Sequence, residues 1–228
     1  MERPTVAIIV PLLNESARLS RLLEMLTALN ADEVMLVDGG STDGSDQLLV
    51  SSHFRWIKSE PGRALQMNSG AGRCQSDILL FLHADTEMSF DALTHLREAM
   101  QNLNIVGGRF DVRLSGTRPA FRMIEWFINT RSRLTRISTG DQCQFVRRTV
   151  FESLGGFPEQ PLMEDVEFSK RLKRAGRIAC LRNKVTTSSR RWEQFGIFRT
   201  ILLMWKLRLY YQLGVTPDRL AAMYRDAR

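Results

Sequence analysis

One short segment places three potential metal ligands directly after an apolar run. The run Ile78–Leu82 is followed by His83, Asp85 and Glu87, which are spaced two residues apart. If the strand continued through them, the three side chains would share one face, because strand side chains alternate with period two. Such a face could hold a divalent metal and the phosphate oxygens bound to it. The alternative is a buried strand whose polar end only begins a loop.

Two other apolar runs also end in polar residues. Asn14 and Glu15 follow the first run, and Asp38 opens the segment Asp38–Gly44 after the second. Ligands of open α/β sheets bind beyond the carboxyl ends of the parallel strands. We therefore expect these two ends and His83–Asp85 to converge at one edge of a sheet and form a site.

The elements that must position these residues alternate between strands and helices over the first hundred residues. Short apolar runs predict strands, and apolar residues that recur every three or four positions predict helices. The alternation indicates an α/β fold with a mostly parallel sheet. The predicted strands are Thr5–Leu13, Glu33–Val37, Arg55–Lys58 and Ile78–Leu82, and the predicted helices are Ser16–Leu29, Ser45–Ser51, Ala64–Ala71 and Asp91–Gln101.

The glycine-rich segment Asp38–Gly44 fits neither of the common phosphate-binding loops. It has no Gly-Lys-Ser/Thr ending and lacks the glycine spacing of dinucleotide-binding proteins. A carboxylate fixed at a strand end is a directional hydrogen-bond acceptor. We expect Asp38 to accept a hydrogen bond from a base or a ribose.

The second half of the chain has a different pattern. Val106–Leu114 and Cys143–Val146 are predicted to be strands, and Pro119–Arg136 is predicted to be a helix. A further helix is expected to open near Met163 and to end near Ala175. Glu164 and Asp165 stand at its start, where acidic residues can simply complement the helix dipole.

The positive charge of the chain belongs to its last quarter. The whole chain has a formal net charge of +7, and residues 166–228 carry 15 Lys and Arg against 4 Asp and Glu. Such a segment could face nucleic acid, anionic lipid or a phosphorylated substrate, or could be a solvated helical face. Within it, Gly196–Gly214 mixes apolar and basic residues, which predicts a helix that lies on an anionic membrane or packs on the catalytic domain.

Three cysteines without paired spacing, Cys74, Cys143 and Cys180, suggest neither a disulfide framework nor a zinc site. The N-terminal residues do not resemble a secretory signal, and no apolar run reaches the length of a membrane span. We expect a cytoplasmic protein, soluble or peripheral on the inner membrane face.

Taken in order, five motifs resemble the family 2 inverting glycosyltransferases of the GT-A fold, including the polyprenyl-phosphate sugar synthases. They are Pro11–Glu15, Val37–Gly44, Gly62–Ala64, Leu82–Asp85 and Glu164–Asp165. The resemblance covers about residues 5–192. It implies a GT-A catalytic domain over 1–192, with a nucleotide-binding half at about 1–104 and an acceptor half at about 105–192, and a C-terminal helical extension over 193–228.

The resemblance also implies roles for individual residues on the donor side. A UDP- or GDP-linked sugar would be the donor, and a Mg²⁺ or Mn²⁺ ion would neutralise the departing diphosphate. Asp85 matches the second aspartate of the Asp-x-Asp metal motif, while His83 replaces the first, and Glu87 could compensate. The nucleotide-binding set is Pro11, Asn14, Glu15, Asp38, Gly39, Arg63, His83 and Ala84.

On the acceptor side, Glu164 and Asp165 resemble the pair whose aspartate is the general base that deprotonates the acceptor hydroxyl. Ser188 stands where processive relatives have Gln in Gln-x-x-Arg-Trp, which implies a non-processive enzyme. The residues assigned to the acceptor or the diphosphate are Asp141, Arg190, Arg191 and Trp192. The resemblance implies no nucleic-acid partner.

Two alternatives stay open. A binding protein could retain a nucleotide-sugar pocket after losing catalysis, a hypothesis motivated by His83 and Ser188. A sugar nucleotidyltransferase would also use an α/β sheet and acidic metal ligands. It would need a glycine-rich, basic loop after the first strand, whereas this chain has Pro11–Glu15 there.

Overall fold

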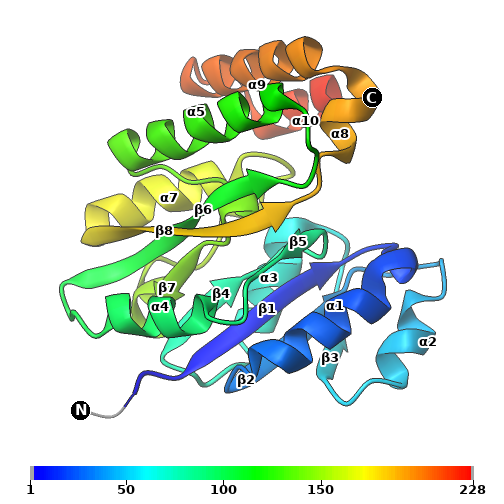
Figure 1. Cartoon of the computed structure of the whole chain (residues 1–228), viewed down its shortest axis with the longest axis vertical. Helices are drawn as coiled ribbons and strands as arrows, with labels where there is room; N and C mark the ends of the chain where they lie inside the picture. Colours follow the sequence, from blue (N-terminus) through cyan, green and yellow to red (C-terminus); the bar gives the residue numbers. More distant parts are fainter. Residues whose placement is uncertain (1–2, 227–228) are drawn as a thin grey trace.

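The computed structural model describes residues 3–226, which form one eight-stranded sheet with helices on both faces (Figure 1). The strand order is β3-β2-β1-β4-β7-β6-β8-β5, in which β3, β2, β1 and β4 pair in parallel, as do β6 and β8. This confirms the predicted α/β class. The strands are β1 (Val6–Leu12), β2 (Glu33–Asp38), β3 (Arg55–Lys58), β4 (Ile78–Phe81), β5 (Thr86–Glu87), β6 (Ile105–Leu114), β7 (Phe145–Arg147) and β8 (Arg177–Thr187).

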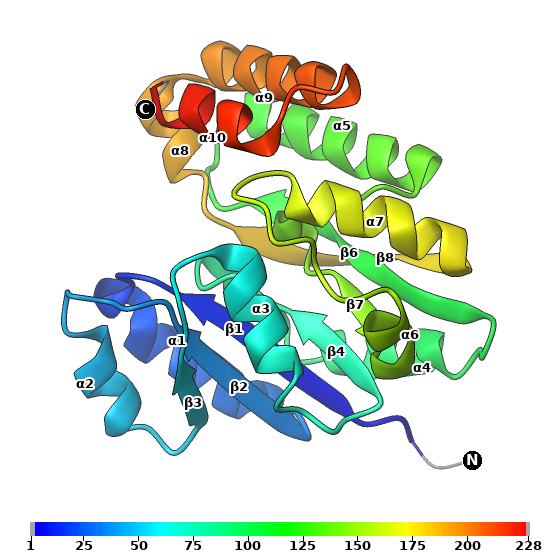
Figure 2. The same ribbon diagram turned by 180° about the vertical axis from the view of Figure 1, so that it is seen from behind.

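Helices cover both faces of the sheet because each strand exposes alternate side chains to opposite sides. Val6, Ile8 and Val10 of β1 pack toward α1 and α4, whereas Ala7 and Ile9 pack toward α3 and α7 (Figure 2). The helices are α1 (Ser16–Leu29), α2 (Ser45–Val50), α3 (Arg63–Ala71), α4 (Ala92–Met100), α5 (Pro119–Thr135), α6 (Arg148–Ser153), α7 (Glu164–Ala175), α8 (Arg190–Phe195), α9 (Ile197–Gln212) and α10 (Pro217–Asp226), with a 3₁₀ turn at Gly140–Gln142.

Helix α1 shows how the apolar pattern fixes the first layer. Its inward residues Leu19, Leu22, Leu26 and Leu29 are all buried against the sheet. Each fully buried leucine contributes roughly 1.5–3 kcal/mol. The helix ends at Asn30, whose left-handed backbone (φ 47°) supports the C-terminal cap. The loop before α1 is thereby held at the carboxyl end of β1.

The last two helices pack on the rest of the chain. Leu207 of α9 and Leu220 of α10 form a buried cluster with Met163 and Val166 at the start of α7. Figure 2 shows α9 and α10 stacked with α5 above α7. Within residues 3–226 no helix combines the length and the apolarity needed to cross a bilayer. The segment after residue 192 thus adds a layer over α5 and the start of α7.

The structure corrects two sequence-based interpretations. The strand predicted to carry His83, Asp85 and Glu87 on one face ends at Phe81, and the chain then turns, with the Thr86 N–H donating to the His83 carbonyl over 3.0 Å. The single-face prediction is therefore wrong. Strand β8, for which no element was predicted, pairs with β6 along most of its length.

Candidate active site

The loops after β1 and β2 are joined by hydrogen bonds between them. The Asn14 N–H donates to the Ser41 hydroxyl over 2.9 Å, and the Thr42 N–H donates to the Asn14 side-chain carbonyl over 2.9 Å. Asn14 adopts a positive φ of 56°, which asparagine tolerates better than most residues. The Glu15 N–H donates to the Ser45 hydroxyl over 3.2 Å. The two predicted nucleotide-binding loops therefore form one unit.

Asp38 lies at the centre of this unit, fully buried at the end of β2. Its carboxylate accepts hydrogen bonds from the Ser41 hydroxyl over 2.5 Å and from the Ser41 N–H over 3.1 Å. Asp43 plays a similar part, since hydrogen bonds from Ser45 and Ser16 hold the pKa of Asp43 well below its usual range. Both aspartates order the loop, and a contact of Asp38 with a base stays a prediction.

Sequence reasoning missed Gln66, which closes the floor of the donor side. From α3, its amide nitrogen donates to the carbonyls of Leu12 over 2.7 Å and of Val37 over 2.9 Å, at the ends of β1 and β2. A Cβ at Gly39 would lie 3.0 Å from the Gln66 amide, so a larger residue than glycine would push against the Gln66 side chain. Pro11 lies in β1 opposite Val37. No local motif marks a glutamine that bonds two distant carbonyls.

Arg63 links the donor side to α7. Its Nη1 lies 3.6 Å from Glu164 Oε1, and the Glu164 side chain is buried. Burial raises the pKa of Glu164, the adjacent Asp165 charge raises it further, and the charge of Arg63 partly offsets both. The predicted pair Glu164–Asp165 therefore lies beside Arg63, which was predicted to bind the nucleotide.

Asp165 is held by backbone donors. Its Oδ2 accepts from the Gly140 N–H over 2.8 Å, and its Oδ1 accepts from the Val166 N–H over 2.7 Å. Met163, just before α7, takes a left-handed backbone (φ 66°), which is strained for this residue type. The chain thus turns sharply into the helix and presents the two acidic residues from its first turn.

The Gly140 turn also holds His83. A Cβ at Gly140 would lie 2.3 Å from His83 Cε1, so the imidazole packs directly on the glycine. His83 Nδ1 lies 3.7 Å from Asp141 Oδ1. Desolvation would raise the pKa of Asp141, but His83 and the charges of Arg63 and Arg191 outweigh it and hold that pKa below its usual range. One turn therefore connects His83, Asp141 and Asp165.

Carboxylates from three parts of the chain act electrostatically on Arg63. Desolvation lowers the pKa of Arg63, but the nearby negative charges outweigh it and raise that pKa overall. These charges are Glu164, Asp165, Asp141 and Asp85, in decreasing order of effect. The residues predicted for base, metal and phosphate roles thus lie close to one another, although they are up to 102 positions apart in the sequence (63 to 165).

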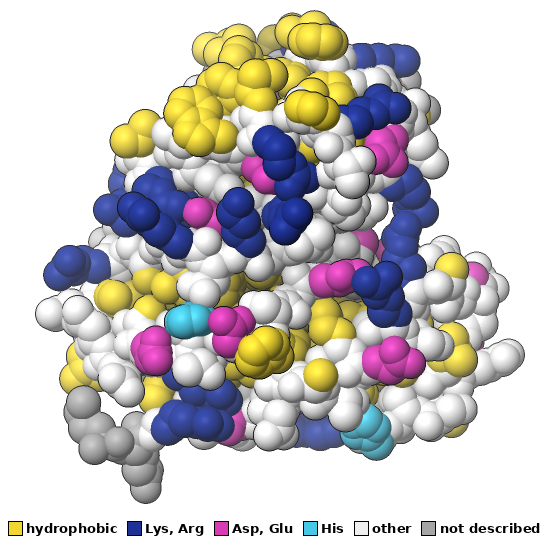
Figure 3. Space-filling model, in the orientation of Figure 1, with side chains coloured by type: hydrophobic (Ala, Val, Ile, Leu, Met, Phe, Trp, Pro, Cys, Tyr) yellow, Lys and Arg dark blue, Asp and Glu magenta, His cyan; other side chains and the backbone are white. Residues whose placement is uncertain are grey.

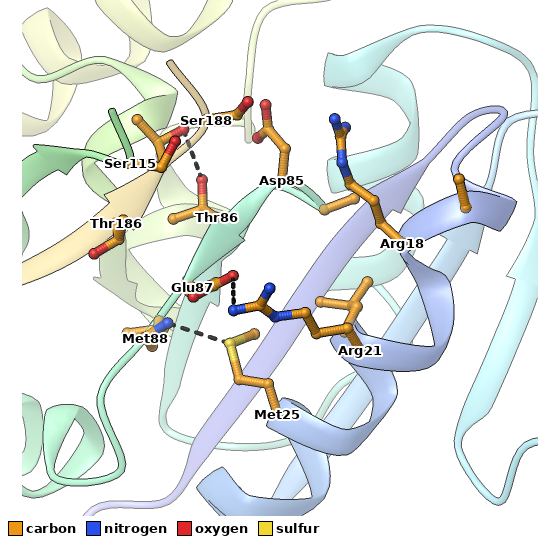
Figure 4. A pocket seen from close by; sticks show the side chains of 14 residues that line it. Arg18, Arg21, Met25, Asp85, Thr86, Glu87, Met88, Ser115, Thr186 and Ser188 are labelled. Atoms are coloured by element: carbon orange, nitrogen blue, oxygen red, sulfur yellow. Dashed lines mark hydrogen bonds and ion pairs between the residues drawn. The ribbon is translucent and has the colours of Figure 1, made fainter. Parts of the chain in front are cut away.

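A cavity of about 440 Å³ lies beside this cluster, between α1, the β4–β5 turn and the end of β8 (Figure 4). Ala84, Asp85, Glu87 and Ser188 line it. Figure 4 shows Asp85 and Glu87 pointing apart, because Glu87 is paired with Arg21 at 2.8 Å. Asp85, in contrast, forms no hydrogen bond or ion pair with any residue of the described chain. Of the two carboxylates, Asp85 is the one free to bind a ligand.

The donor set fits a divalent ion only together with a substrate. No group of three His, Cys, Asp or Glu side chains that could hold a metal occurs within residues 3–226. The Asp85 carboxylate would supply one hard oxygen ligand, and phosphate oxygens of a donor would have to supply others. The metal roles of His83 and Glu87 stay predictions.

The segment predicted to contact acceptor or diphosphate forms α8. Arg191 lies 4.5 Å from the centre of the Tyr224 ring and its charge acts on Asp141. Trp192 packs on the buried cluster of Leu114, Phe121 and Ile124. Arg190 is exposed at the start of the helix. Arg191 is therefore near the site, whereas Trp192 has a packing role and its contact with an acceptor stays a prediction.

Comparison with known proteins identifies the family. The model of "Glycosyl transferase family 2" matches residues 7–155, which contain the predicted nucleotide-binding residues, whereas Glu164 and Asp165 of α7 lie beyond the match. The chain belongs to glycosyl transferase family 2. The part of the candidate site that precedes α7 thus lies within the region that the family model matches.

Curated relatives of this family 2 member are longer than the chain. "Beta-monoglucosyldiacylglycerol synthase" of Nostoc sp. is 25% identical, with 92% of this chain and 53% of the relative aligned. "Undecaprenyl-phosphate 4-deoxy-4-formamido-L-arabinose transferase" of Aeromonas hydrophila is 32% identical, with 57% of this chain and 41% of the relative aligned. The chain spans about half the length of the curated relatives it matches.

Solved structures share its fold. The mannosyltransferase PcManGT from Pyrobaculum calidifontis, in complex with GDP-Man and Mn²⁺, has a TM-score of 0.71 at 19% identity, covering 100% of this chain and 70% of its own. TarS 1-349 of S. aureus has a TM-score of 0.65 at 18% identity, and the match covers 86% of this chain and 64% of the TarS chain. These neighbours confirm the predicted GT-A fold.

Proposed function

We propose that this glycosyltransferase moves a sugar from a nucleoside diphosphate donor to a hydroxyl acceptor, with inversion and without processivity. The observation that carries the proposal is the convergence on Arg63 of Glu164, Asp165, Asp141 and Asp85, beside the joined loops of β1 and β2. Inverting transfer needs one positioned base and a cationic environment for the leaving diphosphate. Asp165 is the proposed base, and Arg63, together with a metal ion at Asp85, would supply the positive charge.

Asp165 is proposed as the general base. Its carboxylate would accept the proton of the acceptor hydroxyl while that oxygen attacks the anomeric carbon from the face opposite the diphosphate. The Gly140 N–H fixes one carboxylate oxygen at 2.8 Å and so limits the rotation of the side chain. Glu164 is proposed to hold Arg63 in place, since it is buried and ion-paired.

The donor is proposed to bind over Asp38 and Gly39, with its diphosphate between Arg63 and Asp85. Mn²⁺ or Mg²⁺ bound at Asp85 would supply charge neutralisation for the leaving group. Support comes from PcManGT, solved with GDP-Man and Mn²⁺, and from TarS, solved with UDP-GlcNAc. We propose a UDP- or GDP-linked donor.

The acceptor is proposed to be lipid-linked or a small metabolite, and the enzyme to contact an anionic membrane from the cytoplasmic side. Relatives named for diacylglycerol and undecaprenyl phosphate substrates support the first part. An exposed apolar face supports the proposed membrane contact. Figure 3 shows apolar side chains gathered over α9 and α5, including Phe198 (80% exposed), Trp205 (68%) and Trp126 (61%). Arg199 and Lys206 lie within the same helix α9 and would suit anionic headgroups.

Nucleoside diphosphate release from a panel of UDP- and GDP-sugars, with and without Mn²⁺, tests the proposal. We expect slow, metal-dependent release from at least one donor, because water can replace the acceptor. A protein that binds a donor tightly but releases no diphosphate with any metal would instead be the non-catalytic binding protein, the alternative motivated by His83. A protein that neither binds nor cleaves any donor would contradict the proposed function.

A further inference from the structure

Two arginines that no motif singled out lie on the acceptor side of Asp165. Arg131 comes from α5 and Arg208 from α9, and both side chains are partly buried. We call them the arginine pair. They are 77 positions apart in the sequence (131 to 208), so only the packing of α9 on α5 and α7 brings them together.

The packing that places the arginine pair is specific. Leu207, the neighbour of Arg208, is fully buried against Met163 and Val166, which flank Glu164 and Asp165. On the other side, Arg131 Nη1 donates to the Ile137 carbonyl over 3.3 Å, and Ile137 packs on the same apolar cluster. Leu207, next to Arg208, and Ile137, whose carbonyl binds Arg131, therefore share one apolar cluster with the start of α7.

The charges of the arginine pair are not neutralised by the described residues. Arg131 Nη2 is buried and has no hydrogen-bond partner within residues 3–226. Arg208 forms neither a hydrogen bond nor an ion pair with the described part of the chain. Asp165 forms no ion pair with either arginine, because its carboxylate oxygens accept the backbone N–H groups of Gly140 and Val166. Leaving the buried Nη2 of Arg131 unpaired is costly, so an anion is the expected partner of this nitrogen and of the unpaired Arg208.

Electrostatics agrees with this placement. Burial, and then the charge of Arg208, lower the pKa of Arg131 to about 10, while Asp165 opposes the shift. Burial also lowers the pKa of Arg208, with Asp165 and Asp141 opposing. The two guanidinium groups thus repel each other and both lie within range of the proposed base.

We propose that Arg131 and Arg208 bind a phosphate group of the acceptor and so bring its hydroxyl to Asp165. Two guanidinium forks match the oxygens of a phosphate monoester better than those of a neutral headgroup. Arg63, in contrast to the arginine pair, forms an ion pair with Glu164. This inference rests on the proposed transferase function and defines its acceptor class.

Calorimetric titration with inorganic phosphate tests the proposal on the full chain. We expect Arg208→Gln and Arg131→Gln each to weaken phosphate binding at least tenfold, while Arg174→Gln, at the exposed end of α7, leaves it unchanged. Two variants from different helices guard against a single misfolded protein, and circular dichroism checks each fold. Equal phosphate affinity in all four proteins, or no binding by the wild type, would overturn the proposal.

A second arm separates a lipid headgroup from a soluble phosphate. Sedimentation with vesicles that contain phosphatidic acid is compared with sedimentation with pure phosphatidylcholine vesicles. Loss of the phosphatidic acid preference in Arg208→Gln assigns the site to a lipid phosphate; an unchanged preference together with weakened inorganic phosphate binding assigns it to a soluble acceptor.

Binding of nucleotide-sugar donors is measured in parallel. Failure of all donors to bind, with phosphate binding that depends on the arginine pair, would refute the transferase and leave the phosphate site standing.

Discussion

The donor side and the acceptor side of this site are built in different ways. The donor side is made mainly of loops that follow β1 and β2, and the hydrogen bonds between these loops join residues about 30 positions apart or fewer, such as Asn14 and Ser41. Gln66 is the longer-range exception, since it bonds the Leu12 carbonyl across 54 positions. The acceptor side joins residues from α5, the Gly140 turn, α7 and α9. The comparison teaches that a local motif can describe one half of an active site while the other half depends on long-range packing.

The largest expected effect comes from the acceptor side. Asp165→Asn removes the proposed base and should lower the turnover of sugar transfer by about 10²–10⁴-fold, because general base catalysis contributes on that scale. Nucleotide affinity should stay close to that of the wild type, since Asp165 does not contact the donor loops. Glu159→Gln, an exposed change before α7, is the matched control. Normal turnover of Asp165→Asn would refute the assignment.

The Gly140 turn tests whether the two sides are mechanically connected. Gly140→Ala would place a Cβ 2.3 Å from His83 Cε1, and such overpacking costs about 1–3 kcal/mol of folding free energy. We expect a lower urea midpoint of unfolding and a displaced His83 imidazole. NMR of the His83 ring would detect the displacement. Gly72→Ala, where a Cβ would meet nothing closer than 3.6 Å, is the control. Equal midpoints for the two variants would show that the turn is loosely packed.

Gln66 tests the donor side by itself. Gln66→Leu removes the donor of two hydrogen bonds and leaves the buried carbonyls of Leu12 and Val37 without that partner. We expect a loss of about 1–3 kcal/mol in the free energy of unfolding, because each of the two lost hydrogen bonds contributes about 0.5–1.5 kcal/mol; the Leu12 carbonyl keeps the Gly39 N–H as a second donor. Gln47→Leu on the exposed face of α2 should have little effect. A Gln66 variant as stable as that control would mean that the strand ends do not need this brace.

Glu164 should make the folding stability of the protein depend on pH. Its pKa is raised on folding, so the native state holds the proton more tightly than the unfolded state. The stability that this proton contributes is present below the ordinary pKa of about 4.5 and is lost as the pH rises through the folded value. The stability of the wild type relative to Glu164→Gln should therefore fall as the pH rises from 4 to 8, measured by urea unfolding. A difference that grows with pH would contradict the shift.

The smallest effect is expected at the rim of the cavity. Arg21 and Glu87 form an exposed ion pair, and such pairs contribute only about 0.2–1 kcal/mol. Arg21→Gln should therefore shift the unfolding midpoint slightly and less at high salt, as followed by urea unfolding at two salt concentrations. A large, salt-independent loss would show that Arg21 supports the donor side in another way.

The donor side could be predicted from the sequence because its signals are local. Asn14, Asp38 and Asp85 each follow an apolar run, and the parallel pairing of β1, β2 and β4 brings the three ends together. Gln66 and Gly140 gave no such signal, since their roles depend on contacts with distant backbone. The sequence left open whether the strand continued through His83, because an apolar run does not show where pairing stops.

The acceptor side was harder to predict for a physical reason. Strand β8 has a mixed, partly exposed pattern, and charged residues interrupt its apolar positions. Arg131 and Arg208 look like ordinary helix-surface charges in the sequence, and only the burial of Leu207 turns Arg208 inward. The family resemblance pointed to Asp165, but no motif marked the arginines beside it.

Titration of the best nucleotide sugar into the wild type and Asp85→Asn, with and without Mn²⁺, tests the central claim most directly. The claim is that the donor diphosphate binds where Asp85 faces Arg63. We predict that Mn²⁺ strengthens donor binding by the wild type and that Asp85→Asn loses this gain, while Glu87→Gln, whose carboxylate is already paired with Arg21, keeps most of it. An Asp85→Asn protein that responds to Mn²⁺ as the wild type does would contradict the account.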